Sequence, residues 1–418
     1  MEIIELERNE FIEFSKNYPY STFFQSPHWI DVKKDNGWDG KIVGVKENNK
    51  IIAATVLLFK NIKFINKKIV YAPRGFLLDY TNHDLVREFT LAIKKYLKKN
   101  GGLFLKINPY VKYTERDVNG VKKENSENNE LVELLTSLGY IHQGFYVKMD
   151  EKKDLEPRWL SVLNLENKTS DEILKNMRAT TRWSVKNSMK NCLRIIECKE
   201  NDLQEYKDLM EHTANRRKFI DRPLSYYKTL YNVLSKDNLI KVLLVEINFK
   251  ELLDNHENYI IELDKKIETV KKDGHKKELL SEKESLEKKI KDLKEYVKTY
   301  GDKKIIAGGL YMLYGKQVVY LLGASYKEFM KYNAQYLLQW EMINYAIDNN
   351  YQTFNFYGID GDFSEESKNY GLFDFKRGFG SEVVELIGEF DLVIKKTYYK
   401  LYNLAFKLYG KLKSLKLK

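Results

Sequence analysis

The side chains that could do chemistry in this sequence are mainly cations, and they occur in three groups. The first group lies between Asp171 and Arg194, where no acidic residue separates Glu172 from Glu197. Its basic residues recur every four positions, so a helix would align them along one side, where like charges repel. An anionic partner removes that repulsion, and a phosphate backbone would bind there with strong salt dependence. A merely solvated face is the alternative. The candidate phosphate contacts are Arg178, Arg182, Lys186 and Lys190, with Ile173, Leu174, Met177, Val185 and Met189 expected on the buried side.

The second group surrounds a turn that Pro223 fixes. The sequence Arg216-Arg217-Lys218-Phe219-Ile220-Asp221-Arg222-Pro223 is followed by Ser225-Tyr226-Tyr227. Arginine binds phosphate through two parallel hydrogen bonds, and tyrosine stacks on flat rings. The segment therefore suits a phosphorylated ligand that contains a ring, although ordinary loop chemistry explains the same residues equally well.

The third group is the C-terminal segment 395–418, which has eight lysines and no acidic residue. Leucine, tyrosine and phenylalanine alternate with these lysines, as in helices that lie on anionic lipid. A last helix docked on the body of the protein is the alternative interpretation, and the two are compatible.

The basic groups must be positioned by helices and strands, and two parts of the chain predict the same order of these elements. The first part predicts strands at 41–45, 51–59 and 69–72, a helix at 84–99 and a strand at 103–107. The second part predicts strands at 241–245, 305–313 and 318–324, a helix at 333–348 and a strand at 353–356. We infer two copies of one mixed α/β unit. By analogy, this α/β (α+β) order is compatible with two tandem GNAT-like (acyl-CoA N-acyltransferase-like) domains.

The segment 248–300 interrupts the second copy and is rich in Glu, Lys, Asp and Leu. Apolar residues recur there in steps of four and three on both sides of Gly274, which predicts an antiparallel coiled-coil hairpin. Its place at the tip of a β-hairpin is one where insertions are tolerated. A solvated spacer and an arm that touches a partner fit the pattern equally. The polar stretch 112–130 is expected to be a mobile excursion.

These patterns divide the chain into four parts. We expect a first GNAT-like domain at 1–153 and a second formed by 154–247 and 301–394. The coiled-coil hairpin takes 248–300, and a basic amphipathic helix takes 395–418.

Composition excludes several classes of protein. The chain has 418 residues, a formal net charge of +11 and 43% hydrophobic residues, which is ample for real cores and argues against disorder. No apolar run approaches a membrane span, and the N-terminal stretch is acidic where a secretory signal would be basic, so we expect a cytoplasmic protein. Only Cys192 and Cys198 occur, and the six histidines are scattered, so neither a disulfide framework nor a metal site is expected.

Several short motifs, taken together, carry an identification. They are Phe24-Gln-Ser-Pro-His-Trp29, Pro73-Arg-Gly75, Asn108-Pro-Tyr110, Ser161-Val-Leu-Asn-Leu165, Phe354-Asn-Phe-Tyr-Gly-Ile-Asp-Gly361 and Gly371-Leu-Phe-Asp-Phe-Lys-Arg-Gly-Phe-Gly380. In this order, and over nearly the whole chain, the sequence resembles the FemA/FemB/FemX family of aminoacyl-tRNA-dependent peptidyltransferases. These enzymes build the interpeptide bridge of peptidoglycan in Gram-positive bacteria. The coiled coil is most similar to the FemA/FemB branch, since the resemblance implies that the FemX type lacks it.

The resemblance implies a cleft for a peptidoglycan precursor and assigns roles to five residues. Lys33 and Arg222 match phosphate-binding positions, and Tyr226 and Tyr320 match tyrosines that contact the precursor. Lys376 matches a lysine considered to stabilise the transition state. Where relatives often carry an acid, this sequence has Asn108, so that position cannot be a general base here.

The implied reaction needs no nucleophile and no cofactor from the protein. An aminoacyl-tRNA ester is already activated, so a stem-peptide amine can attack it directly, helped by positioning and by charge stabilisation from Lys376. Water, a substrate group or a tRNA hydroxyl could each serve as the base. The basic residues at 178–190 become the expected tRNA contact, and the C-terminal segment becomes the expected contact with the inner membrane face.

Other points stay open. The acceptor is either lipid II or UDP-MurNAc-pentapeptide, and the hairpin either closes on itself or supports association with itself or with related peptidyltransferases. An acetyl-CoA acyltransferase is disfavoured because no pyrophosphate loop precedes a helix. A non-enzymatic RNA-binding or scaffold protein is the other alternative, and replacement of Lys376 would then be silent.

Overall fold

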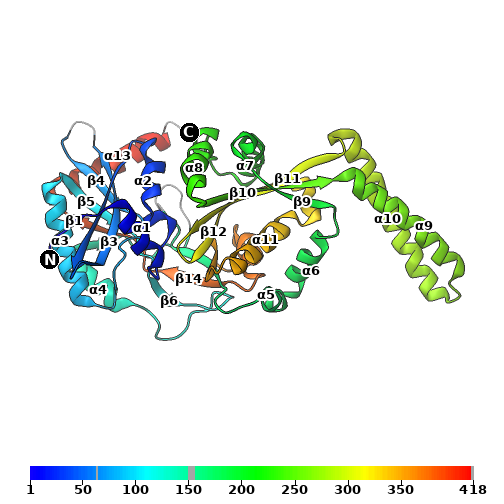
Figure 1. The fold of residues 1–418 in the computed structure, drawn as a ribbon, viewed down its shortest axis with the longest axis horizontal. Coiled ribbons are helices and arrows are strands. Elements are labelled where there is room, and N and C mark those ends of the chain that lie inside the picture. The colour runs from blue at the N-terminus through cyan, green and yellow to red at the C-terminus, as the bar shows by residue number, and fades with distance from the viewer. Residues whose placement is uncertain (63–64, 149–155, 416–418) are drawn as a thin grey trace.

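The computed structural model describes residues 1–62, 65–148 and 156–415. An elongated body contains two β-sheets, and a long helical arm projects from one end of it (Figure 1). The first sheet has the strand order β1-β2-β3-β4-β5-β15-β7, and the second has the order β6-β14-β8-β13-β12-β11-β10-β9.

The strands of the first sheet are β1 (Ile4–Glu5), β2 (Asp39–Glu47), β3 (Lys50–Asn61), β4 (Lys68–Ala72), β5 (Gly102–Ile107), β7 (Tyr140–His142) and β15 (Phe390–Val393). Those of the second are β6 (Lys112–Glu115), β8 (Trp159–Asn164), β9 (Leu193–Glu197), β10 (Ile240–Asn248), β11 (Lys303–Tyr314), β12 (Gln317–Ser325), β13 (Thr353–Ile359) and β14 (Glu382–Leu386). The helices up to the arm are α1 (Arg8–Asn17), α2 (Pro27–Lys34), α3 (His83–Lys99), α4 (Asn129–Ser137), α5 (Ser170–Asn176), α6 (Ala179–Ser188), α7 (Leu203–Arg217) and α8 (Leu224–Leu234). The arm and the remainder contribute α9 (Phe249–Thr269), α10 (Asp273–Tyr300), α11 (Ala334–Asp348), α12 (Tyr370–Arg377) and α13 (Lys396–Leu415).

The duplicated unit is confirmed by identical strand pairing in the two halves. In the first half β2, β3 and β4 pair antiparallel in sequence order, and β4 pairs parallel with β5 after the crossover helix α3. In the second half β10, β11 and β12 pair antiparallel, and β12 pairs parallel with β13 after α11. The predicted mixed α/β fold of two tandem units is therefore correct.

Each sheet includes one strand from the part of the chain that was predicted to form the other domain. The late strand β15 inserts between β5 and β7 in the first sheet, whereas the early strand β6 forms an edge of the second sheet against β14. The predicted boundary between residues 153 and 154 lies outside the described residues. The exchange ties the two halves together through main-chain hydrogen bonds.

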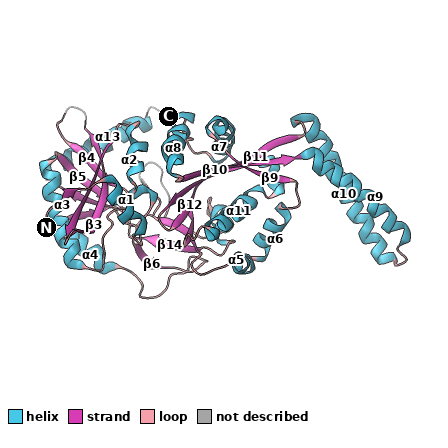
Figure 2. Cartoon of the chain, in the orientation of Figure 1, coloured by secondary structure: helices cyan, strands magenta, loops and turns pink. Residues whose placement is uncertain are grey.

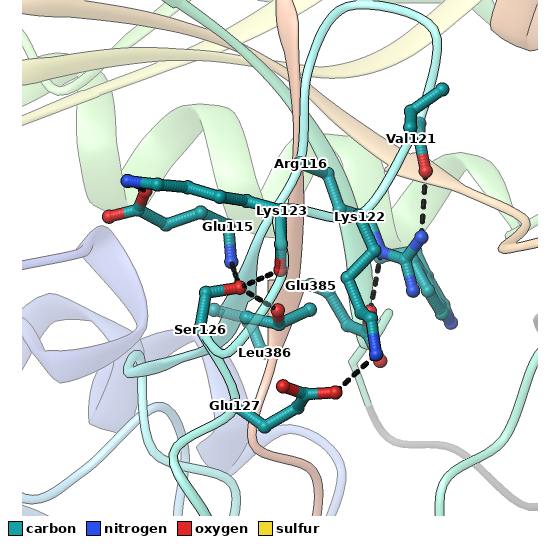
Figure 3. Close-up of polar contacts among 12 residues, drawn as sticks. Glu115, Arg116, Val121, Lys122, Lys123, Ser126, Glu127, Glu385 and Leu386 are labelled. Atoms are coloured by element: carbon teal, nitrogen blue, oxygen red, sulfur yellow. Dashed lines mark hydrogen bonds and ion pairs between the residues drawn. The ribbon is translucent and has the colours of Figure 1, made fainter.

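The polar stretch 112–130, which its composition predicts to be a mobile excursion, begins with strand β6 and is held by further contacts. Figure 3 shows ion pairs of Arg116 with Glu385, at 2.6 Å, and of Lys122 with Glu127. The hydroxyl of Ser126 also donates to the Lys123 carbonyl oxygen at 2.7 Å. These contacts, together with the β6 pairing, hold the stretch against the second sheet.

The arm forms where the heptad pattern places it, at the tip of the β10–β11 hairpin. Helix α9 follows β10 directly, its start capped by Asn248, whose side chain accepts from the Glu251 amide. Leucines at the predicted seam are buried between the two helices, among them Leu263, Leu286 and Leu293. The helical hairpin is confirmed, while a supercoiled geometry stays a prediction. These leucines pack within the hairpin, whereas Ile261 and Leu280 of the arm are exposed.

Helices cover both faces of the second sheet (Figures 1 and 2). Helices α7 and α8 lie on one face, and α5, α6 and α11 lie on the other. The core under α7 and α8 also contains Phe24 and Trp29 of the first half, so it joins the two halves. The imidazole Nε2 of His28 lies 2.8 Å from Asp237 Oδ2 across the same junction.

Candidate functional site

Lys33 is positioned by helix α2 at the junction between the two halves. Pro27 starts this helix, where the missing amide hydrogen carries no penalty. Trp29 and Lys33 are four residues apart and share one helical face, so the Lys33 ammonium lies 4.5 Å from the Trp29 ring centroid. Burial lowers the pKa of Lys33, and nearby Arg222 lowers it further, whereas Glu156 raises it.

Arg222 and Tyr226 are positioned by Asp221. The Asp221 carboxylate accepts hydrogen bonds from the Tyr227 hydroxyl at 2.6 Å, from Lys207 at 2.7 Å and from the Arg222 amide at 2.7 Å. These bonds fix the turn before α8, and the exposed Arg222 guanidinium lies 5.8 Å from the Tyr226 ring centroid. The structure thus brings three residues of the sequence-predicted site, Lys33, Arg222 and Tyr226, into one cluster.

Glu156 also lies within this cluster and is not among the residues predicted from the sequence. Its carboxylate accepts a hydrogen bond from the Tyr357 hydroxyl and faces Arg74 and Lys33. Burial raises the pKa of Glu156 to about 7, although these three neighbours each favour the charged form. No local motif marks Glu156, because its neighbours come from distant parts of the chain.

Asn108 organises the other side of the cluster. Its Oδ1 accepts from the Arg74 amide at 2.7 Å and from the Tyr71 hydroxyl at 3.3 Å. Arg74 in turn donates from Nη2 to the Pro157 carbonyl oxygen at 2.7 Å, next to Glu156. Asn108 therefore has a scaffolding role, in agreement with the expectation that it is not a base.

Two non-glycine residues of the cluster have left-handed backbone conformations. The φ angle is +55° at Arg74 and +66° at Tyr357. Such conformations are costly for residues with a Cβ and persist where surrounding contacts enforce them, often at functional sites. Here Asn108 holds Arg74, and the Asn355 side chain accepts from the Tyr357 amide at 2.8 Å.

Lys376 is joined to the cluster through the main chain of β13. Its ammonium donates to the Gly358 carbonyl oxygen at 2.7 Å, one residue after Tyr357. The side chain is only 4% exposed, and burial lowers its pKa to about 7. Lys376 is therefore a buried lysine with a tuned pKa and not a surface cation stacked on aromatic rings.

Tyr320 lies apart from the cluster. It packs on the α11 side of the second sheet, 5.3 Å from the Tyr311 ring centroid, and its hydroxyl donates to Gln335 Oε1 at 3.0 Å. Tyr226 packs in the core on the other side, under α7 and α8. A precursor contact by Tyr320 stays a prediction that no contact in the described structure supports.

The basic segment 171–194 forms two short helices, not the single helix that its spacing predicts. Helix α5 ends at Asn176, α6 starts at Ala179, and Arg194 lies on strand β9. Met189 is 56% exposed and does not join the buried side as predicted. On α6 and the turn after it, Lys186 and Lys190 are exposed.

Arg178 is already paired. Its guanidinium contacts both carboxylate oxygens of Asp374 on α12, at 2.6 and 3.0 Å, and its amide donates to the Gly378 carbonyl oxygen at 2.9 Å. The start of α6 is thereby fixed to the helix that carries Lys376.

An exposed aromatic side chain accompanies the cations of α6. Trp183 is 63% exposed, although tryptophan is usually buried for most of its area. Next to it in the chain, Arg182 donates to the Lys175 carbonyl oxygen at 2.7 Å. The spacing of the charges does not predict a role for Trp183, although its place among basic residues could have indicated one.

The C-terminal helix α13 is docked at its start and exposed further on. Tyr399 is buried against Phe104, with ring centroids 5.2 Å apart, and its hydroxyl donates to Asp391 Oδ2 at 2.8 Å. Beyond it, apolar side chains face outward, namely Leu401, Leu404, Phe406 and Leu408. Residues 416–418 lie outside the described residues. Within the part of the chain described, no helix is both long and apolar enough to span a membrane.

A family model described as "FemAB family" matches residues 6–407. The aminoacyltransferase FemA of Staphylococcus epidermidis is 33% identical over 420 residues, covering 98% of this chain and 100% of that protein. FemA of Staphylococcus aureus is 32% identical over 416 residues, covering 96% of this chain and 98% of that protein. The chain belongs to the FemAB family. The activity class predicted from the sequence, an aminoacyltransferase, is thereby confirmed.

A crystal structure of FemX has the same fold, with a TM-score of 0.78 and 26% identity over 96% of this chain and 99% of that chain. The higher identity to the FemA proteins agrees with the expected similarity to the FemA/FemB branch. That the arm marks this branch stays a prediction.

Proposed function

We propose that this protein transfers an amino acid from aminoacyl-tRNA to the stem-peptide amine of a peptidoglycan precursor in the cytoplasm, extending an interpeptide bridge. Family membership supports the reaction class. One continuous set of contacts supports the placement of the two substrates, because it leads from the basic surface of α6 to Lys376 and on to the cluster at Lys33.

The donor side of this proposal is the surface of α6. Arg182, Lys186 and Lys190 would contact the phosphate backbone of the tRNA, and Trp183 would stack on an unpaired base. Arg178 has a different role, because its pairing with Asp374 holds the tRNA-binding helix against α12. This arrangement would bring an ester carried by the tRNA end near Lys376.

The acceptor side is the cluster of Lys33, Arg222 and Tyr226. Two cations and a tyrosine suit a diphosphate that carries a ring, as in the precursor. UDP-MurNAc-pentapeptide and lipid II both have this chemistry at the relevant end. Stabilisation of the tetrahedral oxyanion falls to Lys376, whose ammonium would exchange its Gly358 partner for the oxyanion or act through the Gly358 main chain.

The exposed apolar side chains of α13 favour the lipid-linked acceptor. A docked first turn followed by an apolar face among lysines fits a helix lying on an anionic membrane surface. This would hold the enzyme at the inner membrane face, where a lipid-linked precursor is found. Self-association or association with related peptidyltransferases remains a prediction.

The decisive experiment supplies purified protein with a pool of charged tRNA and, separately, with UDP-MurNAc-pentapeptide and lipid II. We expect a mass gain on an acceptor, and its size identifies the amino acid. Bare and already extended stem peptides should both be offered, because the position in the bridge is open. Absence of any gain with demonstrably charged tRNA would refute the proposal and favour an RNA-binding protein.

A further inference from the structure

We propose that the Glu156 carboxylate is the general base of this reaction and takes the proton from the acceptor amine before it attacks the aminoacyl ester. This inference rests on the function proposed above and adds to it the residue that the sequence left unassigned. It is carried by the place of Glu156 between the acceptor-binding residues and the main-chain segment held by Lys376.

The geometry fixes Glu156 from two sides. The Tyr357 hydroxyl donates to one carboxylate oxygen, Oε2, so the carboxylate is oriented as an acceptor. The Arg74 guanidinium binds the carbonyl oxygen of Pro157, the next residue, and thereby holds the main chain beside Glu156. The residue as a whole is half-buried at this junction.

The cluster also explains how the chain dispenses with an acid at position 108. Asn108 binds the Arg74 amide, and Arg74 lies beside Glu156. The Glu156 carboxylate is thus linked to Asn108 through Arg74, although it comes from a different segment of the chain. Among the described residues, the titratable and charged groups that face it are Lys33 of α2, Tyr71 of β4, Arg74 after β4, Tyr226 of α8, Tyr357 of β13 and Glu389 before β15.

The proposed step balances without any further reactant. The acceptor ammonium gives one proton to Glu156 and becomes a neutral amine. The nitrogen lone pair forms a bond to the ester carbonyl carbon, the carbon–oxygen bond to the tRNA ribose breaks, and the ribose oxygen takes the second proton lost by the nitrogen. Glu156 then releases its proton to solvent.

A carboxyl group with a raised pKa is suited to accept a proton from the acceptor ammonium. An ordinary glutamate with a pKa near 4 is a weak base for an ammonium, whereas burial raises the pKa of Glu156 to about 7. Because general bases work best when their pKa lies near the working pH, the environment of Glu156 favours proton transfer.

The test compares Glu156→Gln and Glu156→Asp with the unaltered protein on two acceptors. One acceptor carries the natural amine, and the other carries an aminooxy group, which is uncharged at neutral pH and needs no base. We expect Glu156→Gln to lower kcat/KM for the amine acceptor by about 10²- to 10⁴-fold. The loss with the aminooxy acceptor should be far smaller. Glu156→Asp should recover part of the amine activity, and Glu166→Gln, an exposed neighbour in sequence, serves as the matched control.

The pH profile gives a second readout. In the unaltered protein the rate with the amine acceptor should rise with pH near pH 7, as Glu156 becomes ionised. Glu156→Gln should lack this rise and keep only the fall at higher pH that loss of the Lys376 proton causes. An equal loss on both acceptors, or an unchanged rise, would show that Glu156 only supports the fold. If Glu156→Gln does not fold, the same comparison is made with Glu156→Asp. Failure of the unaltered protein to transfer at all would instead refute the proposed function.

Discussion

Arg178 and Asp374 form a two-point ion pair that joins the start of the basic helix α6 to helix α12, two residues before Lys376. This pairing assigns Arg178 a positioning role. We predict that Arg178→Ala lowers kcat while leaving the Kd for tRNA nearly unchanged, because the guanidinium is engaged with Asp374. Asp374→Asn should have the same effect.

A double-mutant cycle on Arg178 and Asp374 measures how much their ion pair contributes to the free energy of unfolding. The two side chains are partly exposed, so we expect a coupling of about 0.5–1 kcal/mol in the free energy of unfolding. Additive effects on both kcat and stability would show that the pair does not act as a unit.

The basic surface of α6 makes a prediction about salt dependence. Alanine at Arg182, Lys186 and Lys190 should weaken tRNA binding and lower the slope of log K against log salt by about 0.7–0.9 for each phosphate that is no longer neutralised. Combined alanine replacement of Lys277, Lys288 and Lys291, three exposed lysines of the arm, is the control for net charge alone. An identical slope in the α6 variant and the unaltered protein would exclude this surface as the tRNA site.

Trp183 makes a separate prediction, because stacking depends little on salt. Replacement of a stacked aromatic side chain by alanine typically costs about 1–3 kcal/mol of binding free energy. We therefore expect Trp183→Ala to weaken tRNA binding at least about fivefold with an unchanged salt slope. Trp183→Phe should keep much of the affinity. Because the side chain is exposed, neither change should lower the melting temperature.

The sequence predicted the elements well because their patterns are local. The heptads of the arm and the repeated strand order each follow from residues close together in the chain. The break between α5 and α6 was missed because neither glycine nor proline marks it at Met177 and Arg178. The strand exchange of β6 and β15 was missed because pairing partners over such distances leave no local signal.

The site was predicted less completely than the fold. Lys33, Arg222 and Tyr226 lie near one another, while the substrate-binding roles implied by the family resemblance stay predictions. Glu156 gains its properties only from Tyr357 and Arg74, which are distant in the chain, so its tuned pKa could not be inferred from composition. Tyr320 faces the opposite side of the second sheet because neighbouring residues of a strand alternate between its faces.

The exposed part of α13 predicts a membrane contact, and its loss can be measured without a change in the stability of the fold. Serine at Leu404, Phe406 and Leu408 should lower binding to vesicles that contain anionic lipid, without lowering the melting temperature, because these side chains are exposed. Tyr399→Ala should instead lower the free energy of unfolding, because Tyr399 packs against Phe104 and donates a hydrogen bond to Asp391. We expect that change to destabilise the protein by about 3 kcal/mol. Equal vesicle binding by the serine variant would remove the membrane role.

The buried ammonium of Lys376 predicts how stability depends on pH. Its pKa is about 7 in the folded protein and near 10.4 in an unfolded chain. Between these values the unfolded chain binds a proton that the folded protein does not, so the free energy of unfolding rises with pH. Relative to Lys376→Met, the unaltered protein should gain a few kcal/mol, on the scale of about 1.4 kcal/mol per pKa unit, as pH rises from 7 toward 10. Denaturant unfolding of both proteins across this range measures the difference, with exposed Lys368→Met as the control. Lys376→Met should also abolish transfer, and a parallel pH dependence in the two proteins would mean that Lys376 stays charged in the folded state.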